Sequence, residues 1–337
     1  MLVGITYDLR EDYLAEGYSE EETAEFDRID TIDAIEDVLR NLGCETVRLG
    51  NIRSLTRRLA MGERWDLVFN IAEGLNGFGR EAAVPALLEA YGIPYTFSDP
   101  LVNSLTLHKE MTKRVVRQLG FPTADFAVAQ SSADLKMVDL PFPLFLKPVA
   151  EGTGKGITAA SKVVDSESLQ TVGERLLQLF KQPVLVETFL PGREVTVGII
   201  GSGDRTEAIG VVEIILRDNA ENEVYSYVNK ERCELLVEYR PVNDELARSA
   251  STLAVEIWKK LGCRDAGRID FRADADGIPN FLEVNPLAGL NPEHSDLPII
   301  CTAQEIPYAT LIRRIMEEAC LRAGLNAPWQ AVRALRV

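Results

Sequence analysis

Basic residues, histidines and cysteines are all scarce in this sequence. Its 337 residues include 36 lysines and arginines against 52 aspartates and glutamates, which gives a formal net charge of −16. Proteins that bind nucleic acids or anionic membranes gain most of their affinity from basic side chains that meet phosphates. The charge therefore argues against both kinds of partner. The two histidines, His108 and His294, are isolated from each other, and we expect neither to bind a metal ion.

Neither disulfide bonds nor membrane spans are expected. The five cysteines are scattered and no two form a C-x-x-C pair, which is typical of reduced thiols rather than of a disulfide framework or a zinc site. No run approaches the roughly 18 apolar residues that cross a membrane. The N-terminus also lacks the basic region and cleavage site of a signal peptide. These absences predict a cytoplasmic protein.

The sequence does contain enough apolar material for several domains. Hydrophobic residues make up 46% of the chain, and a domain typically spans roughly 100 to 200 residues. Near the N-terminus the pattern predicts strands at 2–7 and 65–71 and helices at 29–42 and 82–91. Alternating strands and helices are typical of a parallel α/β unit. The acidic segment 8–27 has no periodicity and is expected to form a long loop or lid.

The remainder of the sequence predicts a different arrangement. We expect one basic helix over residues 103–119, followed by strands at 143–147, 184–189, 194–200 and 208–215 and by helices at 166–181, 244–261 and 307–323. Strands that follow one another without intervening helices favour antiparallel sheets. The predicted fold class is therefore α/β, with a parallel N-terminal unit and antiparallel sheets after it.

A hairpin late in the sequence carries polar residues at alternate positions. Asp276-Gly277 favours a two-residue type I′ turn. This turn would set Arg268 opposite Asn285 and Asp270 opposite Glu283 on one face of the hairpin. The other face would carry the apolar side chains of Ile269, Phe271, Leu282 and Val284, with Phe271 opposite Leu282.

The opposed carboxylates of Asp270 and Glu283 point to a metal site. Two carboxylates that face each other repel, and a cation between them relieves the repulsion. Ligands that offer only oxygen favour Mg²⁺ or Mn²⁺ over zinc. The alternative is a solvated outer face with an ordinary pair of arginine and carboxylate, and the hairpin alone leaves both interpretations open.

Residues 151–156 (EGTGKG) form a glycine-rich segment that could bind phosphate. Its glycines alternate, Lys155 lies inside it, and Lys147 ends the preceding strand. Backbone N–H groups can approach a phosphate closely in such a segment. The spacing is not that of a Walker A loop, and residues 157–159 are expected to continue as a strand. We expect a hairpin that covers a nucleotide as a flap, although a flexible hairpin without a ligand fits equally well.

Two further acids, Glu187 and Glu194, flank a predicted turn. Their carboxylates could accept hydrogen bonds from an adenine amine and from ribose hydroxyls. The alternative is a pair of surface acids beside a turn, which is the commoner place for glutamate.

Taken in order, these segments resemble the ATP-grasp superfamily, and within it the D-alanine–D-alanine ligase-like branch. The resemblance covers the chain from residue 65 to the last helix and includes F-L-K-P at 145–148, the stretch 187–194, G-R-I-D at 267–270 and E-V-N-P at 283–286. It implies an ATP-grasp fold with a Rossmann-like N-terminal domain at 1–102, a central domain with the flap at 103–189, a C-terminal domain at 190–324 and a tail at 325–337. The central and C-terminal domains would be α+β domains, with ATP held between them.

The resemblance also implies roles for particular residues. ATP would contact Lys109, Lys147, Lys230, the flap residues Glu151, Gly152, Thr153, Gly154, Lys155 and Gly156, and the adenine and ribose ligands Glu187, Phe189, Leu190 and Glu194. Asp270, Glu283 and Asn285 would hold two Mg²⁺ ions, with Mn²⁺ as a substitute. Arg268 and the backbone N–H of Gly289 would stabilise an oxyanion, and Ser295 and Lys230 are counted with them as catalytic.

The implied reaction is the joining of a carboxylate to an amine. The carboxylate takes the γ-phosphoryl group of ATP, and the amine then displaces phosphate to give a dipeptide or related amide. Water must be excluded from the acyl-phosphate, and the flap and segment 8–27 are candidate lids. The expected partners are small amino-acid or peptide substrates and a second copy of the chain, since such ligases usually form homodimers.

The sequence departs from the ligases on the amino-acid side. Only Thr23-Ala24-Glu25 matches the segment that binds the first ammonium group, and Glu73 replaces a histidine in a segment that also gains Arg80. The serines of the flap become Thr153-Gly154 with Lys155 added, Glu231 replaces a tyrosine, and 285–295 is one residue longer. We therefore expect a substrate other than D-alanine, with Arg80 and Lys155 available for an extra acidic group.

Two alternatives remain at this point. The chain could be an ATP-grasp ligase for other amino acids or peptides in a biosynthetic pathway. It could instead belong to a different class, as an ATP-grasp kinase for a small molecule or a nucleotide-binding protein without turnover. Arg268 together with the Gly289 loop favours an oxyanion intermediate, and hence a ligase.

Overall fold

The N-terminal part is a three-layer unit around a parallel sheet, as predicted. The computed structural model describes residues 1–220 and 226–329. The sheet has the order β2-β1-β3 with all strands parallel. Its elements are β1 (Leu2–Thr6), β2 (Glu45–Gly50), β3 (Leu67–Asn70), α1 (Arg10–Ala15), α2 (Ile29–Asn41), α3 (Ile52–Ala60) and α4 (Ala83–Ala90). The sequence did not predict β2 and α3, because β2 is only partly buried and α3 carries several arginines. The expected loop at 8–27 contains the short helix α1.

The central part is a four-stranded antiparallel sheet covered by two helices. The strand order is β4-β7-β5-β6. Its elements are β4 (Phe126–Ala129), α7 (Ser132–Lys136), β5 (Leu144–Pro148), the 3-10 turn η1 (Ala159–Ser161), β6 (Lys162–Val163), α8 (Ser166–Phe180) and β7 (Val184–Thr188). The predicted strand at 157–159 is wrong. Thr158 instead caps η1 through its side chain, so a long loop joins β5 to β6.

The C-terminal part is a five-stranded antiparallel sheet with the order β10-β9-β8-β11-β12. Its strands are β8 (Glu194–Ile200), β9 (Glu207–Leu216), β10 (Val237–Pro241), β11 (Ala266–Ala273) and β12 (Pro279–Asn285). Its helices are η2 (Gly203–Arg205), α9 (Tyr227–Glu231), α10 (Cys233–Leu236), α11 (Glu245–Leu261), α12 (Asp296–Ala303) and α13 (Tyr308–Ala323). The buried face of α11 packs on one side of the sheet, and α12 packs close to Gly198 on the other.

The predicted single helix at 103–119 is two helices, α5 (Pro100–Leu107) and α6 (Lys109–Gln118). His108 separates them with an extended backbone, and its ring accepts a hydrogen bond from the Met111 N–H at 3.4 Å. Both helices pack on β12, where Val102 and Val116 join the core of the C-terminal sheet. The break places Lys109 at the start of α6, beside the loop that follows β5.

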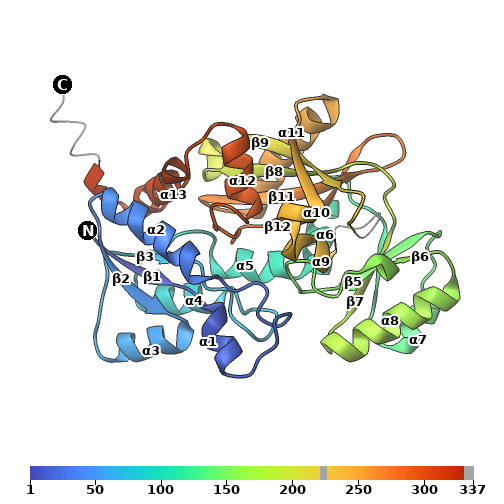
Figure 1. Cartoon of the computed structure of the whole chain (residues 1–337), viewed down its shortest axis with the longest axis horizontal. Coiled ribbons are helices and arrows are strands. Elements are labelled where there is room, and N and C mark those ends of the chain that lie inside the picture. The colour runs from blue at the N-terminus through green and yellow to red at the C-terminus, as the bar shows by residue number, and fades with distance from the viewer. Residues whose placement is uncertain (221–225, 330–337) are drawn as a thin grey trace.

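The N-terminal and C-terminal parts share a core. Helix α13 packs against α2, and Ile315 and Met316 lie in one buried cluster with Val3 and Ile5. Figure 1 shows the parallel sheet and the C-terminal sheet side by side, with the central sheet at the opposite end. Ala327, within the predicted tail, is buried in the same cluster, while residues 330–337 lie outside the described part of the chain. No helix among the described residues has the length and apolar character to cross a membrane.

Candidate active site

The hairpin of β11 and β12 has the predicted pairs at its functional end. Arg268 faces Asn285, and Asp270 faces Glu283. The predicted turn is nevertheless wrong, because Asp274 and Ile278 close a wider turn through a backbone hydrogen bond of 3.0 Å. A bulge after Asp270 compensates for this change in turn length.

The bulge also corrects the predicted partner of Phe271. Phe271 pairs with Phe281 rather than with Leu282. The Leu282 side chain is therefore not part of the buried face that holds Ile269 and Val284, and it lines a cavity together with Asp270.

The carboxylates of this hairpin do not lie on a solvated surface. Asp270 is 6% exposed, accepts a hydrogen bond from the Thr196 hydroxyl at 2.9 Å and forms an ion pair with Arg268. Burial raises the pKa of Asp270 to about 6, with the Glu283 charge adding to the rise and Arg268 opposing it. Nearby lysines, with Lys109 foremost, hold the pKa of Glu283 below its usual range despite burial.

These residues fit a magnesium ion by the chemistry of their side chains. Asp270, Glu283 and Asn285 supply oxygen atoms, which are the ligands that Mg²⁺ prefers. The Asn285 side-chain nitrogen is buried and has no hydrogen-bond partner among the described residues. This nitrogen is a donor and calls for an acceptor such as a phosphate oxygen, whereas the amide oxygen is the atom that could face a cation. The predicted metal residues therefore lie together in an environment suited to a cation.

A cavity of about 80 Å³ lies between the central and C-terminal sheets. Six of the predicted ATP residues line it, namely Lys147, Glu187, Phe189, Leu190, Glu194 and Lys230. Arg272 and Leu282 also line it and were missed by the sequence analysis. Arg272 could have been found, because strand alternation puts it on the same face as Arg268 and Asp270.

Glu187 is the most strongly ion-paired residue of this cavity. Its carboxylate lies 2.6 Å from the Lys113 ammonium and 2.8 Å from the Lys147 ammonium. Lys113 and then Lys147 hold the pKa of Glu187 at about 2 despite burial. Lys113 is fully buried and is a site residue that the sequence analysis did not identify. Phe189 completes this wall, with the Lys162 ammonium 4.4 Å from its ring centroid and the Arg272 guanidinium carbon 4.9 Å from it.

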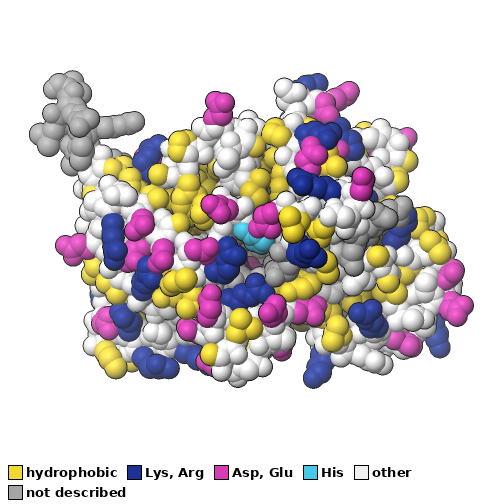
Figure 2. Space-filling model, viewed as in Figure 1, with side chains coloured by type: hydrophobic (Ala, Val, Ile, Leu, Met, Phe, Trp, Pro, Cys, Tyr) yellow, Lys and Arg dark blue, Asp and Glu magenta, His cyan; other side chains and the backbone are white. Residues whose placement is uncertain are grey.

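A larger cavity of about 230 Å³ adjoins the first. It brings together predicted residues from three regions: Lys109, then Glu151, Gly152 and Thr153 of the flap, and Lys230, Arg268, Glu283, Asn285, Gly289 and Ser295. Lys230 and Glu283 line both cavities, which therefore meet at these two residues. In Figure 2, acidic and basic side chains gather around a hollow near the centre of the visible face.

Arg268, Gly289 and Ser295 lie on one side of the larger cavity. The Arg268 guanidinium contacts Asp296 at 3.2 Å as well as Asp270. A Cβ atom on Gly289 would lie 2.7 Å from the Ser295 hydroxyl, so the two residues are in close contact. The Ser295 hydroxyl accepts a hydrogen bond from the Asn291 N–H at 3.0 Å, which fixes the loop.

His294 lies in the same loop and links it to α10. Its Nδ1 atom is 2.8 Å from the Glu234 carboxylate and 3.6 Å from the Cys233 sulfur. The contact with Cys233, followed by that with Glu234, raises the pKa of His294 to about 9. We expected neither histidine to bind a metal ion. The potential ligand atoms of His294, Cys233 and Glu234 nevertheless lie within 4.8 Å of one another.

The flap and the acidic segment after β1 meet at Glu25. The Glu25 carboxylate lies 3.0 Å from Arg80 and 2.8 Å from Lys155, and Lys155 is also 2.5 Å from Glu151. Arg80 and Lys155 were expected to be available for an acidic substrate group. That expectation is wrong, because Glu25 and Glu151 already neutralise both cations.

The other flap glycines pack against the protein. A Cβ atom on Gly154 would lie 3.0 Å from the Tyr227 backbone nitrogen, and one on Gly156 would lie 2.7 Å from the Phe180 ring. Both glycines have positive φ, which other residues rarely adopt. Their role in this structure is thus to shape the loop.

The fold and the two adjoining cavities define a ligase of the ATP-grasp class. A family model described as the D-ala D-ala ligase C-terminus matches residues 107–317. The chain belongs to the D-alanine–D-alanine ligase family, and it is accordingly an ATP-dependent carbon–nitrogen ligase. Members of this family bind ATP and typically Mg²⁺.

Curated relatives cover most of the chain. The D-alanine–D-alanine ligase of Bordetella petrii is 36% identical over 274 residues, which are 80% of this chain and 80% of the relative. That of Aquifex aeolicus is 36% identical over 287 residues, which are 84% of this chain and 92% of the relative.

Solved structures share the fold. The D-alanine–D-alanine ligase of Bacillus anthracis complexed with ATP has a TM-score of 0.69 at 23% identity and covers 96% of this chain and 99% of that chain. The VanG D-Ala:D-Ser ligase of Enterococcus faecalis has a TM-score of 0.71 at 20% identity, with coverage of 94% and 99%.

Proposed function

We propose that this chain joins the carboxylate of one amino acid or peptide to the amine of another through an acyl-phosphate, with ADP and phosphate as the other products. One observation carries the proposal: the two cavities meet at Lys230 and Glu283. A ligase needs a nucleotide and a carboxylate substrate to meet at the γ-phosphoryl group. The larger cavity provides space for two amino acids beside that point, which a protein that only binds a nucleotide would not need.

The smaller cavity is proposed as the nucleotide site. Phe189, Leu190 and Leu282 offer apolar contact to a base, and Glu187 and Glu194 offer acceptors for its amine and for ribose hydroxyls. Lys109, Lys147 and Lys230 would neutralise the phosphates, because all three surround Glu283 closely enough to lower its pKa. The flap residues from Glu151 to Gly156 would cover the phosphates and exclude water.

Asp270, Glu283 and Asn285 are proposed to hold two Mg²⁺ ions, with Mn²⁺ able to replace them. When bound, the metal neutralises charge on the phosphoryl group during transfer. The chain's contribution is to hold these oxygen atoms rigidly at the hairpin end. The hydrogen bond from Thr196 and the ion pair with Arg268 fix Asp270.

Arg268, the backbone N–H of Gly289 and Ser295 are proposed to act on the tetrahedral intermediate. A fixed donor of this kind typically contributes about 3 kcal/mol to the stabilisation of the transition state. The ion pairs with Asp270 and Asp296 hold the Arg268 guanidinium in place, so the enzyme need not reorganise it during the reaction.

Measurement of products tests this function directly. The enzyme is incubated with MgATP and a panel of D- and L-amino acids, ADP release is followed, and products are identified by mass spectrometry. Loss of water between two substrates supports the ligase. Addition of a phosphate group to a single substrate would instead show a kinase, and turnover of D-alanine alone would contradict our expectation of a different substrate.

We also propose that the enzyme works as a cytoplasmic homodimer. The dimer rests on the resemblance to the ligase family, and the location rests on the use of ATP. Light scattering coupled to gel filtration should give twice the 37.3 kDa mass of one chain. A monomeric mass at micromolar concentration would contradict the dimer, and recovery from a membrane fraction would contradict the location.

A further inference from the structure

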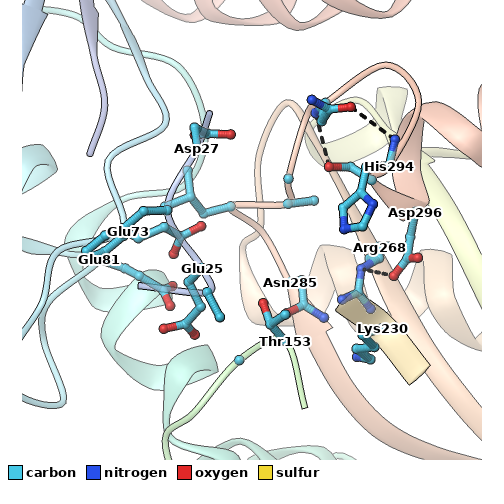
Figure 3. A pocket seen from close by; sticks show the side chains of 18 of the residues that line it. Glu25, Asp27, Glu73, Glu81, Thr153, Lys230, Arg268, Asn285, His294 and Asp296 are labelled. Atoms are coloured by element: carbon cyan, nitrogen blue, oxygen red, sulfur yellow. Dashed lines mark hydrogen bonds and ion pairs between the residues drawn. The ribbon is translucent and has the colours of Figure 1, made fainter. Parts of the chain in front are cut away.

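One wall of the larger cavity carries more carboxylates than its cations neutralise. Asp27, Glu73 and Glu81 line this wall together with Glu25. We call the first three residues the acidic wall. Figure 3 shows these carboxylates on one side of the cavity, across from Lys230, Arg268 and Asn285.

The cations nearest the acidic wall have other partners. Arg80 donates to both oxygens of Glu25 and to the Ala150 carbonyl at 2.9 Å. Lys155 is paired with Glu25 and Glu151, and Lys109 lies 3.3 Å from Glu283. Glu25 is therefore neutralised twice, and neither of its cations forms an ion pair with the acidic wall.

Glu81 is the residue that most clearly lacks a partner. It is 9% exposed and lines the cavity, and its carboxylate forms no hydrogen bond or ion pair within residues 1–220 and 226–329. A buried charged group without a partner costs several kcal/mol or takes up a proton. Burial accordingly raises the pKa of Glu81 to about 7 and that of Asp27 to about 8. Burial, with the Glu81 charge adding to it, also raises the pKa of Glu73 well above its usual range.

The two sides of the cavity thus differ in the charge they would accept. A zwitterionic amino acid would turn its carboxylate toward Arg268, Lys109 and Lys230, because the γ-phosphoryl group must arrive there. Its ammonium group would turn toward the acidic wall. Alanine offers that wall one positive charge, whereas the wall holds three carboxylates that form no ion pair with the described residues.

We propose that the acidic wall binds the side-chain cation of a basic amino acid, so that one of the two ligated substrates is a diamino acid. Glu81 and Glu73 receive the side-chain ammonium group, and Asp27 lines the same cavity. This inference rests on the proposed ligation of amino acids and specifies the chemical class of one substrate.

A comparison of isosteric substrates tests the inference on the unmodified enzyme. ADP release is measured with lysine, ornithine and norleucine in both configurations, each alone and with D-alanine as second substrate. Norleucine has the same side-chain length as ornithine, with a methyl group in place of the ammonium group. We expect kcat/KM for the preferred diamino acid to exceed that for norleucine at least tenfold. Equal or better turnover of norleucine or alanine would overturn the acidic wall as a cation site.

A substitution separates recognition from folding. Glu81→Gln removes the charge at nearly constant volume and should raise KM for the diamino acid at least tenfold, while it raises KM for neutral amino acids less, because these lack the side-chain ammonium group. Glu256→Gln, an exposed glutamate on α11, is the matched control. Glu73→Gln should give the same selective change and serves if Glu81→Gln does not fold.

The outcomes distinguish this inference from the proposed function. Turnover of neutral amino acids alone, with Glu81→Gln behaving like the control, would overturn the cation site and leave the ligase intact. No ADP release with any amino acid would overturn both. A phosphorylated diamino acid as the product would overturn ligation but would still show recognition of the cation.

Discussion

The carboxylate of Glu25 lies 2.8 Å from the Lys155 ammonium, although 130 residues separate them in the sequence. Glu25 belongs to the acidic segment that follows β1, and Lys155 belongs to the flap. Both segments had been expected to act as lids. The ion pair connects them over the larger cavity, and Arg80 holds the same carboxylate from the other side. The acidic segment and the flap are therefore joined through the side chain of Glu25.

Replacement of Glu25 should destabilise the folded protein strongly. Glu25→Gln leaves Arg80 buried without its counter-ion and Lys155 with Glu151 alone, and removing one partner of a buried pair typically costs about 3 kcal/mol or more. The free energy of unfolding from urea denaturation measures the loss. Glu20→Gln, in the exposed part of the same segment, is the control. A loss no larger than that of the control would show that the ion pairs contribute little.

A methyl group on Gly152 should disturb the same junction from the flap. A Cβ atom there would lie 2.1 Å from a Glu25 carboxylate oxygen, so the side chain or the loop must move. Overpacking of this kind typically costs about 1 to 3 kcal/mol. We expect Gly152→Ala to lower both the free energy of unfolding and kcat/KM. Gly79→Ala is the matched control, because its new Cβ atom would lie 3.6 Å from the nearest atom. Equal behaviour of the two variants would contradict the close contact.

The stability of the ligand-free enzyme should fall as pH rises from about 5 to 8. Burial raises the pKa of Asp27 to about 8 and that of Glu81 to about 7, whereas both groups titrate near pH 4 in the unfolded chain. Between these values the folded state binds more protons than the unfolded state, so the free energy of unfolding decreases with pH. Urea denaturation at several pH values should show this decline, and Glu81→Gln should make it shallower. An unchanged slope in Glu81→Gln would exclude Glu81 as a source.

Glu25 should act in the opposite direction at low pH. The charges of Arg80 and Lys155 outweigh burial and lower its pKa to about 2. Its contribution to stability is therefore fully present above about pH 5 and is lost as pH falls toward 2. The two effects occupy separate pH ranges, so the same series of measurements resolves both.

The sequence predicted the facing pairs of the hairpin correctly although the predicted turn was wrong. Alternation along β11 and β12 places Asp270 and Glu283 on one face. The wider turn shifts the pairing of the two strands by one residue, and the bulge shifts it back. Neither irregularity has a clear signal in the sequence. The division of the helix at His108 was missed for a similar reason, because the basic residues around it are compatible with a continuous helix.

The electrostatic partners could not be predicted from the sequence. Strand periodicity indicates which face a side chain occupies, but it does not reveal that Arg80 and Lys155 converge on Glu25 from positions 55 and 130 residues away. An unpaired acid such as Glu81 is likewise identified only when every neighbouring cation has been assigned a partner. The proposed recognition of the substrate depends on these long-range pairs, whereas Glu187, Asp270 and Glu283 are positioned by alternation along β7, β11 and β12.

Loss of either facing carboxylate should abolish turnover. Asp270→Asn or Glu283→Gln replaces a negatively charged carboxylate of the proposed metal site with a neutral amide. We therefore expect kcat to fall at least about 100-fold. Titration with Mg²⁺ should show a higher half-saturating concentration wherever activity remains. Asp276→Asn, in the exposed turn of the same hairpin, should behave like the unmodified enzyme. Near-normal rates in Asp270→Asn and Glu283→Gln would show that the hairpin does not hold the metal.

Leu282 should affect binding of the nucleotide rather than the chemical step. The bulge turns this side chain into the smaller cavity beside Phe189 and Leu190, where it can cover the base. Removing such an apolar contact typically costs about 1.5 to 3 kcal/mol, and we therefore expect Leu282→Ala to raise KM for ATP about tenfold or more. The kcat value at saturating ATP should change little, because Leu282 offers only apolar contact. Ile278→Ala is the control, since Ile278 is half exposed in the turn before β12. A fall in kcat with an unchanged KM for ATP would contradict the placement of the base against Leu282.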